Sequence, residues 1–175
     1  MSGHLTVLPS AQAEIPNAPP KGNAEQEQPV MLLRDLEKQD YDQIVQVIDR
    51  WSGGPTSSLV HPFLFYELGR MAEVVERDSQ LVGFLFGFLS QTAEPVGYVH
   101  LIAVHPDFRR RGVGRLLYSK FEENCRAHGC VALKSMTAPG NESATAFHKA
   151  LGFGAELFEG YAGPGRPRVV FGKQI

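Results

Sequence analysis

The sequence predicts a mixed α/β fold, in which helices cover both faces of a central mixed β-sheet. Two patterns support this class. Short apolar or alternating segments recur between amphipathic helical segments in the order β-α-α-β-β-β-α-β-α-β-β. The segment 81–89, LVGFLFGFL, contains no polar residue, as expected for a central strand that is covered on both sides.

Composition predicts how the chain is organised. Residues 1–29 are rich in Ala, Pro, Gln and Glu without periodicity, which predicts a tail or an arm that a partner orders. Residues 30–175 suffice for one domain with a single core. The two cysteines, Cys125 and Cys130, are too few for a disulfide framework and lack metal-ligand spacing, and Cys125 falls on an apolar helix stripe. We expect a cytoplasmic domain without a metal site.

The first expected elements are a strand at 30–33 and a helix. Asp40 and Gln43 have the spacing of a capping box, which predicts the start of this helix. Gly53 ends it, and a short second helix is expected around 62–68. The apolar face of the first helix would comprise Tyr41, Ile44, Val45, Ile48 and Trp51.

Three strands are expected next, over 71–77, 80–90 and 96–104, with Asp78-Ser79 as a tight hairpin between the first two. Regular alternation in the third strand would place Tyr98, His100, Ile102 and Val104 on one face, and Val99, Leu101 and Ala103 on the other. The remaining expected elements are a helix over 113–128, a strand over 131–135, a helix over 141–151, and strands over 155–161 and 168–173.

Charge and hydropathy exclude two classes of partner. The net charge of −2 and a pI near 6.3 provide no basic field for nucleic acid or for an anionic membrane surface. The longest apolar run has about half the length of a membrane-spanning helix. We therefore expect neither nucleic acid nor a membrane as a partner.

The most informative segment is VHPDFRRRGVGRLL, residues 104–117. A strand ends at Pro106, a turn rich in Arg and Gly follows, and an amphipathic helix begins at once. Gly112 and Gly114 would let a bulky ligand approach the main chain, and the helix start offers unpaired N–H groups. A diphosphate suits this turn, although a solvated basic turn before an ordinary helix has the same composition.

This segment resembles the acetyl-CoA-binding motif of the GNAT N-acetyltransferase superfamily, with Arg109-x-x-Gly112-x-Gly114 after an Ala-Val-His-Pro strand end. A second segment, from Asn141-Glu-Ser-Ala144 to Phe147-His-Lys-Ala-Leu-Gly-Phe153, is similar to the Asn-x-x-Ala … Tyr … Gly-Phe helix of that family. The resemblance extends over 30–175, and it implies the GNAT fold and an acetyl-CoA-dependent N-acetyltransferase.

The resemblance also implies cofactor contacts. The turn would hold the diphosphate of acetyl-CoA, at Arg109, Arg110, Arg111, Gly112, Val113, Gly114 and Arg115. The pantetheine arm would lie along Ile102, Ala103 and Val104, where a main-chain N–H near Ile102 would polarise the thioester carbonyl. In the second motif, Asn141, Ser143 and Phe147 would contact the cofactor, although Asn141 also suits a plain helix N-cap.

The catalytic residues are inferred in the same way. His148 stands where many members have a Tyr that donates a proton to the departing thiolate; the alternatives are a helix-surface His and donation by water. The strand YVHLIAVH (98–105) is similar to one in arylalkylamine N-acetyltransferases, which makes His100 the candidate base, with Tyr98 where those enzymes have a second His. A hydrogen-bonded core histidine is the alternative for His100.

The predicted reaction is direct attack of a primary amine on acetyl-CoA in a ternary complex. Another acyl donor, or a non-catalytic CoA-binding module, remains an alternative. The acceptor would be a small-molecule or peptide amine bound near Trp51 and the 57–61 loop. The aromatic residues there are compatible with an aromatic or hydrophobic amine, although core packing explains most of them equally well. A homodimer is an open alternative, because dimers are frequent in the family.

Overall fold

The computed structural model describes residues 31–67, 71–91 and 94–175, and the expected tail over 1–29 lies outside them. Within these ranges the strands form one seven-stranded sheet in the order β1-β2-β3-β4-β5-β7-β6. All neighbours are antiparallel except β4 and β5, which confirms the mixed sheet. The strands are β1 (Met31–Asp35), β2 (Ala72–Arg77), β3 (Gln80–Ser90), β4 (Val96–Val104), β5 (Ala132–Thr137), β6 (Gly154–Phe158) and β7 (Arg168–Gln174).

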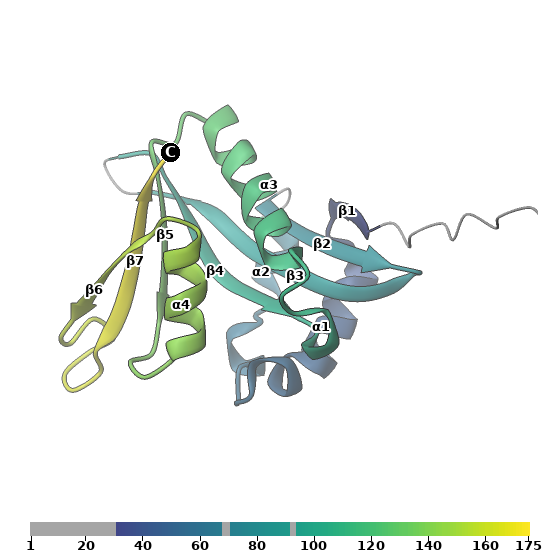
Figure 1. Ribbon diagram of the computed structural model, residues 1–175, viewed down its shortest axis with the longest axis horizontal. Helices are drawn as coiled ribbons and strands as arrows, with labels where there is room; N and C mark the ends of the chain where they lie inside the picture. Colours follow the sequence, from purple (N-terminus) through teal and green to yellow (C-terminus); the bar gives the residue numbers. More distant parts are fainter. Residues whose placement is uncertain (1–30, 68–70, 92–93) are drawn as a thin grey trace, which may run out of the picture.

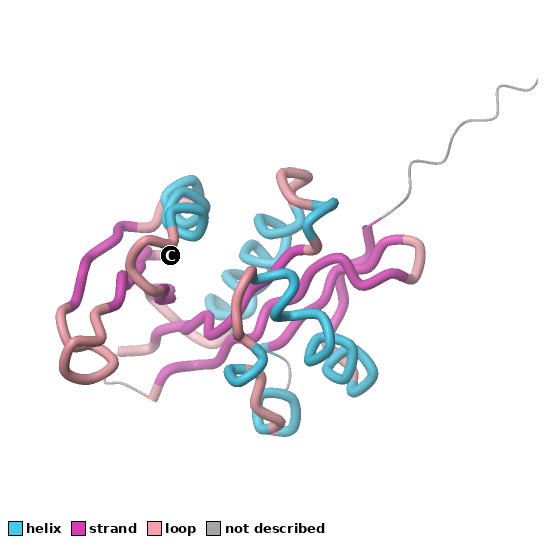
Figure 2. The backbone as a smooth tube through the Cα atoms, turned by 90° about the horizontal axis from the view of Figure 1, so that it is seen from below, coloured by secondary structure: helices cyan, strands magenta, loops and turns pink. Residues whose placement is uncertain are grey.

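Helices cover both faces of the sheet, as expected (Figure 1). One face carries α1 (Lys38–Ser52), the 3₁₀ helix η1 (Ser57–Leu59) and α2 (Phe63–Tyr66), and the other carries α3 (Val113–Ala127) and α4 (Glu142–Ala150). A 3₁₀ helix, η3 (Pro106–Phe108), leads into α3. Figure 2 shows that α1, η1 and α2 lie against the β1–β4 half only. The order of strands and helices agrees with the prediction.

Two apolar clusters fill the layers. The cluster on the α3 side is built around Leu85, Leu117 and Phe121, and the cluster under α1 around Ile44 and Phe84. β3 contributes to both, because its side chains are buried on both faces from residue 81 to 87. The expectation of a central strand covered on both sides is therefore confirmed, and so is the hairpin, whose Asp78 and Ser79 both have positive φ.

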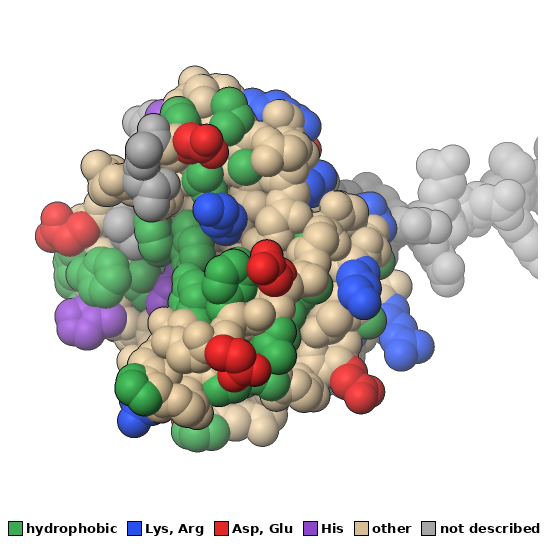
Figure 3. Space-filling view, turned by 90° about the vertical axis from the view of Figure 1, so that its left-hand side faces the viewer, with side chains coloured by type: hydrophobic (Ala, Val, Ile, Leu, Met, Phe, Trp, Pro, Cys, Tyr) green, Lys and Arg blue, Asp and Glu red, His purple; other side chains and the backbone are tan. Residues whose placement is uncertain are grey.

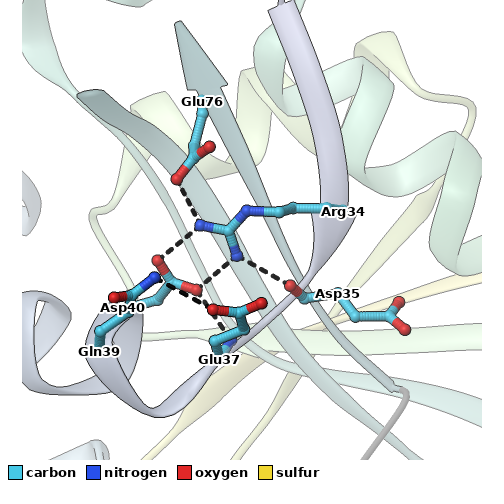
Figure 4. Close-up of polar contacts among 6 residues, drawn as sticks. All are labelled: Arg34, Asp35, Glu37, Gln39, Asp40 and Glu76. Atoms are coloured by element: carbon cyan, nitrogen blue, oxygen red, sulfur yellow. Dashed lines mark hydrogen bonds and ion pairs between the residues drawn. The ribbon is translucent and has the colours of Figure 1, made fainter. Parts of the chain in front are cut away.

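The start of α1 corrects one expectation. Glu37 is the N-cap, and Asp40 lies three residues into the helix, where its Oδ2 accepts the Glu37 N–H at 2.8 Å. Arg34 of β1 donates two hydrogen bonds to the Asp40 carboxylate, at 2.6 and 2.9 Å, and also binds Glu76 of β2 (Figure 4). The predicted capping box of Asp40 with Gln43 is wrong, because Asp40 is buried as the partner of Arg34.

The apolar face of α1 is otherwise as expected, apart from Val45, whose side chain is 39% exposed. The pKa of Arg34 is raised by its hydrogen bonds to Asp40 and Glu76, so this residue stays charged and ties β1, β2 and α1 together. Gly53 ends the helix in the left-handed conformation. The short helix expected around 62–68 is α2, and Leu68 lies outside the described residues.

β4 does not alternate regularly. Phe86 of β3 pairs with Leu101, whereas the next residue, Gly87, pairs with Val99, so His100 is the extra residue of a β-bulge. One inserted residue reverses the alternation beyond it. Val99 therefore shares the α3-side cluster with Ile102 and Val104, whereas Leu101 and Ala103 pack toward α1. The predicted grouping of β4 side chains into two faces is wrong for this reason.

β4 and β5 form a fork. They pair from Val96 with Ala132 to Val99 with Ser135, and not beyond. After that point β4 continues along β3, whereas β5 continues along β7, and Figure 1 shows the two strands diverging. At the last pair the Ser135 Oγ donates a hydrogen bond to the Val99 carbonyl at 3.1 Å. Residues 100–104 of β4 thus have no described strand on their β5 side.

Candidate functional site

The turn before α3 offers a row of unpaired main-chain donors. Gly112 is the N-cap at φ 86°, and Arg110 also has a positive φ of 59°. The first helical hydrogen bond runs from the Leu116 N–H to the Gly112 carbonyl, at 2.9 Å. None of the N–H groups from 110 to 115 donates a hydrogen bond to a described residue. Together with the positive end of the helix dipole, this row suits an anion.

The two glycines of the turn have different roles. A Cβ on Gly112 would meet nothing within 4 Å, but its φ disfavours any other residue. A Cβ on Gly114 would lie 2.9 Å from the Phe147 ring of α4. Gly114 therefore serves the packing of α3 on α4. The sequence alone had predicted that it serves the approach of a ligand. The Phe147 ring is half-buried in the same contact and also touches Tyr118 at 5.8 Å between centroids.

The arginine side chains are mostly engaged by the protein itself. The Arg109 Nε donates to the Val104 carbonyl at 3.3 Å, and its Nη2 donates to the carbonyl of Trp51 at the end of α1. Arg111 stacks over the Phe108 ring, and Arg115 donates to a carbonyl of α4 at 3.4 Å. The guanidinium of Arg109 thus fastens the turn to α1, a role that the sequence did not indicate.

The β4 segment with Ile102, Ala103 and Val104 borders this turn. It pairs with β3 on one side only, so its other edge carries main-chain groups that no described strand uses. An extended edge of this kind can hydrogen-bond an amide-containing chain as an added strand. The fork therefore places an edge for a linear amide arm directly beside the donors for an anion.

The second motif forms the start of α4. The Asn141 side chain caps the helix by accepting the Ala144 N–H at 3.1 Å, and its Nδ2 donates to Thr137 at 3.0 Å. The expected N-cap is confirmed, and both ends of this amide are engaged. Ser143 is exposed on the first turn of α4.

His148 is buried, which corrects the alternative of a surface histidine. Only 4% of it is exposed, and its ring stacks on Phe171 at 4.1 Å between centroids. Its Nδ1 lies 2.8 Å from the Ala144 carbonyl, and its Nε2 lies 2.7 Å from the hydroxyl of Tyr118. Since a carbonyl only accepts, Nδ1 carries the proton and Nε2 accepts from Tyr118. Burial lowers the pKa of His148, so the ring is neutral near pH 7.

His100 and Tyr98 lie on the opposite side of the fork. The bulge directs His100 toward η1, where its Nε2 lies 3.1 Å from the Leu59 carbonyl. Tyr98 stacks on Phe88 of β3, and its hydroxyl lies near the side chain of Tyr161, in the loop between β6 and β7. Burial, with this contact, raises the pKa of Tyr98, which therefore stays protonated.

η1 is held in place by α1. The Asp49 carboxylate accepts the N–H groups of Thr56 and Ser57, both at 2.6 Å, and the Ser57 hydroxyl at 2.9 Å. These hydrogen bonds lower the pKa of Asp49. Tyr41 adds a hydrogen bond to the Val60 carbonyl at 3.1 Å. The carbonyl that His100 contacts is therefore fixed from two positions on α1.

His105 caps η3 by accepting the Asp107 N–H at 3.2 Å. Cys125 has the core role that its place on an apolar helix stripe predicts. Cys125 is buried in the core, and burial raises the pKa of its thiol, so it remains protonated. Tyr118 and Ser135, the polar residues behind the fork, were missed, because their positions in an apolar helix stripe and a short strand carry no signal.

Among the described residues, no group of three or more His, Cys, Asp or Glu side chains is placed to hold a metal ion. None of their helices combines the length and apolar character that crossing a membrane requires.

Comparison with known proteins agrees with this geometry. The model of the acetyltransferase (GNAT) family matches residues 32–153, more than half of the chain. An L-2,4-diaminobutyric acid acetyltransferase of Nocardia farcinica is 33% identical over 78 residues, a match that covers 45% of this chain and 40% of that protein. The aligned part therefore spans less than half the length of this curated relative.

Solved structures show the same fold. Ard1 from Thermoplasma volcanium has a TM-score of 0.70 at 21% identity, covering 83% of this chain and 97% of that one. The structure of yncA, a putative acetyltransferase from Salmonella typhimurium with its cofactor acetyl-CoA, has a TM-score of 0.62 at 16% identity, covering 82% and 93%. At these identities the likeness shows the fold alone, and the family model adds the membership. The chain belongs to the acetyltransferase (GNAT) family.

Proposed function

We propose that this protein is an N-acetyltransferase that transfers the acetyl group of acetyl-CoA to a primary amine. The observation that carries the proposal is the row of unpaired N–H groups from Arg110 to Arg115, beside the unpaired edge of β4. The first suits the diphosphate of CoA and the second suits its amide-bearing pantetheine arm. Family membership and a neighbour solved with acetyl-CoA support the same cofactor.

The conformation of the turn fits that cosubstrate. Gly112 is in a conformation that keeps its N–H and those after it directed outward from the helix start, and no Cβ crowds it. The acetyl thioester, when bound, supplies the activated acyl group. The chain itself would contribute main-chain donors at the bulge of β4 and alignment of the amine with the carbonyl.

His100 is our candidate for accepting the proton that the attacking amine must lose. It is the bulge residue, it lies at the fork, and its Nε2 contact with a carbonyl leaves Nδ1 as the nitrogen that can accept. Its strand is similar to that of arylalkylamine N-acetyltransferases, and this likeness stays a prediction. His100→Ala should slow turnover strongly near pH 7 and recover in part at high pH, where free amine is abundant.

For the departing thiolate we favour water as the proton donor. Both nitrogens of His148 are engaged inside the protein, and Nε2 carries no proton to give. Donation by His148 would need protonation of a buried ring whose pKa is lowered. The role of His148 as the acid stays a prediction that the pH dependence of turnover can test.

The experiment that tests the whole proposal has two arms. Calorimetry with CoA tests the cofactor site, and acetylation of an amine panel with product mass measurement tests the reaction. Binding of CoA, together with a product heavier than the amine by the mass of one added acetyl group, supports acetyl transfer. Binding without any acylated product would leave a non-catalytic CoA-binding module, and no binding would refute both.

A further inference from the structure

Among the described residues, one face of the β5, β7 and β6 half of the sheet has no helix over it. In the β5, β7 and β6 half, residues 133, 135 and 171 point toward α3 and α4, and their neighbours point the other way. Figure 2 shows no helix on that other side of this half, because η1 and α2 stop beside β4. The uncovered face continues from Tyr98 and His100, since Tyr98 pairs with Lys134 of β5.

The uncovered face displays large apolar side chains. Met136 of β5 is 37% exposed and Phe158 of β6 is 41% exposed, and Tyr161, which the Tyr98 hydroxyl contacts, is 45% exposed. On the other side of His100, Leu59 of η1 is 49% exposed. Figure 3 shows hydrophobic side chains gathered on this end of the molecule. Clustered apolar exposure of this kind indicates a surface that binds a ligand or a partner protein.

The charges on this face do not suit a polycation. The register places Lys134, Arg168 and Glu156 on the uncovered side, so the two basic side chains outnumber the acidic one. A small acceptor with several ammonium groups would meet this basic pair. An acceptor with one reacting amine and apolar groups behind it would bring no further positive charge to this pair.

The extent of the surface favours a chain over a small molecule. From Tyr98 on β4 to Phe158 on β6 there are three strand spacings, which amount to about 14 Å. An extended peptide advances about 3.4 Å per residue, so the face matches about four residues. A small aromatic amine that reached His100 would leave most of this surface uncovered.

We propose that the acceptor is the amino terminus of a polypeptide whose first residues are apolar, with the α-amine at His100 and the following residues lying over Met136, Tyr161 and Phe158. This inference rests on the proposed acetyl transfer. It names the substrate class of that site, and it assigns Phe158 and Tyr161 to specificity.

β6 offers a matched pair of variants. Phe158 contacts Tyr161 on the uncovered side, whereas the neighbouring Leu157 pairs with Val169, which packs on the α3-side cluster. Leu157 is 52% exposed, so Leu157→Ser and Phe158→Ser make similar changes on opposite faces of one strand. Met136→Ser on β5 provides a second test of the uncovered face that does not depend on β6.

The assay measures kcat/KM for heptapeptides that differ only in their first four residues, apolar against Ser and Gly, alongside a polyamine, an aminoglycoside and a small aromatic amine. We expect apolar peptides to lead, and Phe158→Ser and Met136→Ser each to lower their kcat/KM by about five- to tenfold, which corresponds to burial of a partly exposed side chain. Leu157→Ser should change it less than twofold, and CoA affinity should be unchanged in all three.

Equal rates for apolar and polar peptides, or equal losses in Phe158→Ser and Leu157→Ser, would overturn the peptide proposal. Faster acetylation of the polyamine, the aminoglycoside or the small amine would also overturn it, while the acetyl transfer itself would stand. Failure to bind CoA would remove the proposed function, and the peptide proposal with it.

Discussion

The buried pair of His148 and Tyr118 allows a prediction with a magnitude. His148→Phe keeps the ring that stacks on Phe171, but it removes the 2.7 Å hydrogen bond to the Tyr118 hydroxyl and the 2.8 Å contact with the Ala144 carbonyl. A buried hydrogen bond contributes about 1 kcal/mol, and a buried group left without a partner costs about 1–3 kcal/mol. We therefore expect His148→Phe to lower the free energy of unfolding by about 2–3 kcal/mol.

A double-mutant cycle separates the pair from the packing. Tyr118→Phe should cost about 1–2 kcal/mol, and the double variant should cost about 1 kcal/mol less than the sum of the single variants, because the second change removes a group that already lacks its partner. The assay is urea unfolding followed by the fluorescence of Trp51, the single tryptophan. Additive losses within about 0.3 kcal/mol would refute the hydrogen bond between the two side chains.

The pH dependence gives a second readout of the same pair. The pKa of His148 is lower in the folded protein than its usual value of about 6.5. Unfolding therefore takes up a proton, so the stability that His148 contributes is complete above about pH 6.5 and is lost as pH falls toward the folded-state pKa. His148→Phe should remove this loss below about pH 6.5, whereas equal slopes in both proteins would contradict a buried neutral ring.

Three further predictions address the turn, the core and η1. Gly112→Val meets no neighbouring atom but forces a β-branched residue to φ 86°. It should raise the dissociation constant of CoA at least about tenfold and leave the circular dichroism spectrum unchanged. Gly129→Val introduces a similar strain after the end of α3 and should leave the dissociation constant of CoA unchanged. Burial raises the pKa of Glu73 to about 7, so the contribution of Glu73 to stability should fall by up to about 3 kcal/mol as pH rises from about 4.5 to 7. In urea unfolding, Glu73→Gln should remove this fall, whereas Glu159→Gln should keep the wild-type slope. Asp49→Ala releases η1, so it should raise the acceptor KM several-fold with CoA affinity unchanged by calorimetry; a change in CoA affinity alone would contradict this role.

Local signals in the sequence predicted the elements that depend on local physics. The turn at 109–112, the N-cap at Asn141, the hairpin at Asp78-Ser79 and the end of α1 at Gly53 all follow from backbone conformations or hydrogen bonds formed within a few residues. The order of strands and helices follows from periodicity. The sequence therefore determined the fold class, and its two motifs indicated the family.

Contacts between distant segments decided the rest. The bulge at His100 is visible only in the register of β4 against β3, and it reverses which side chains face the fork. Gly114 is explained by Phe147 of another helix, and the guanidinium of Arg109 by a carbonyl of Trp51, 58 residues away. Neither partner can be identified from the local pattern.

The same reason applies to the acceptor side. The exposure of Phe158 depends on the absence of a helix over the β5, β7 and β6 half within the described residues, which no strand sequence reveals. His148 is neutral because Tyr118 and Phe171, from α3 and β7, enclose it. The sequence alone determined which chemistry the chain can carry, and the tertiary structure decided which side chains are free to carry it, because burial and pairing depend on segments far apart in the chain.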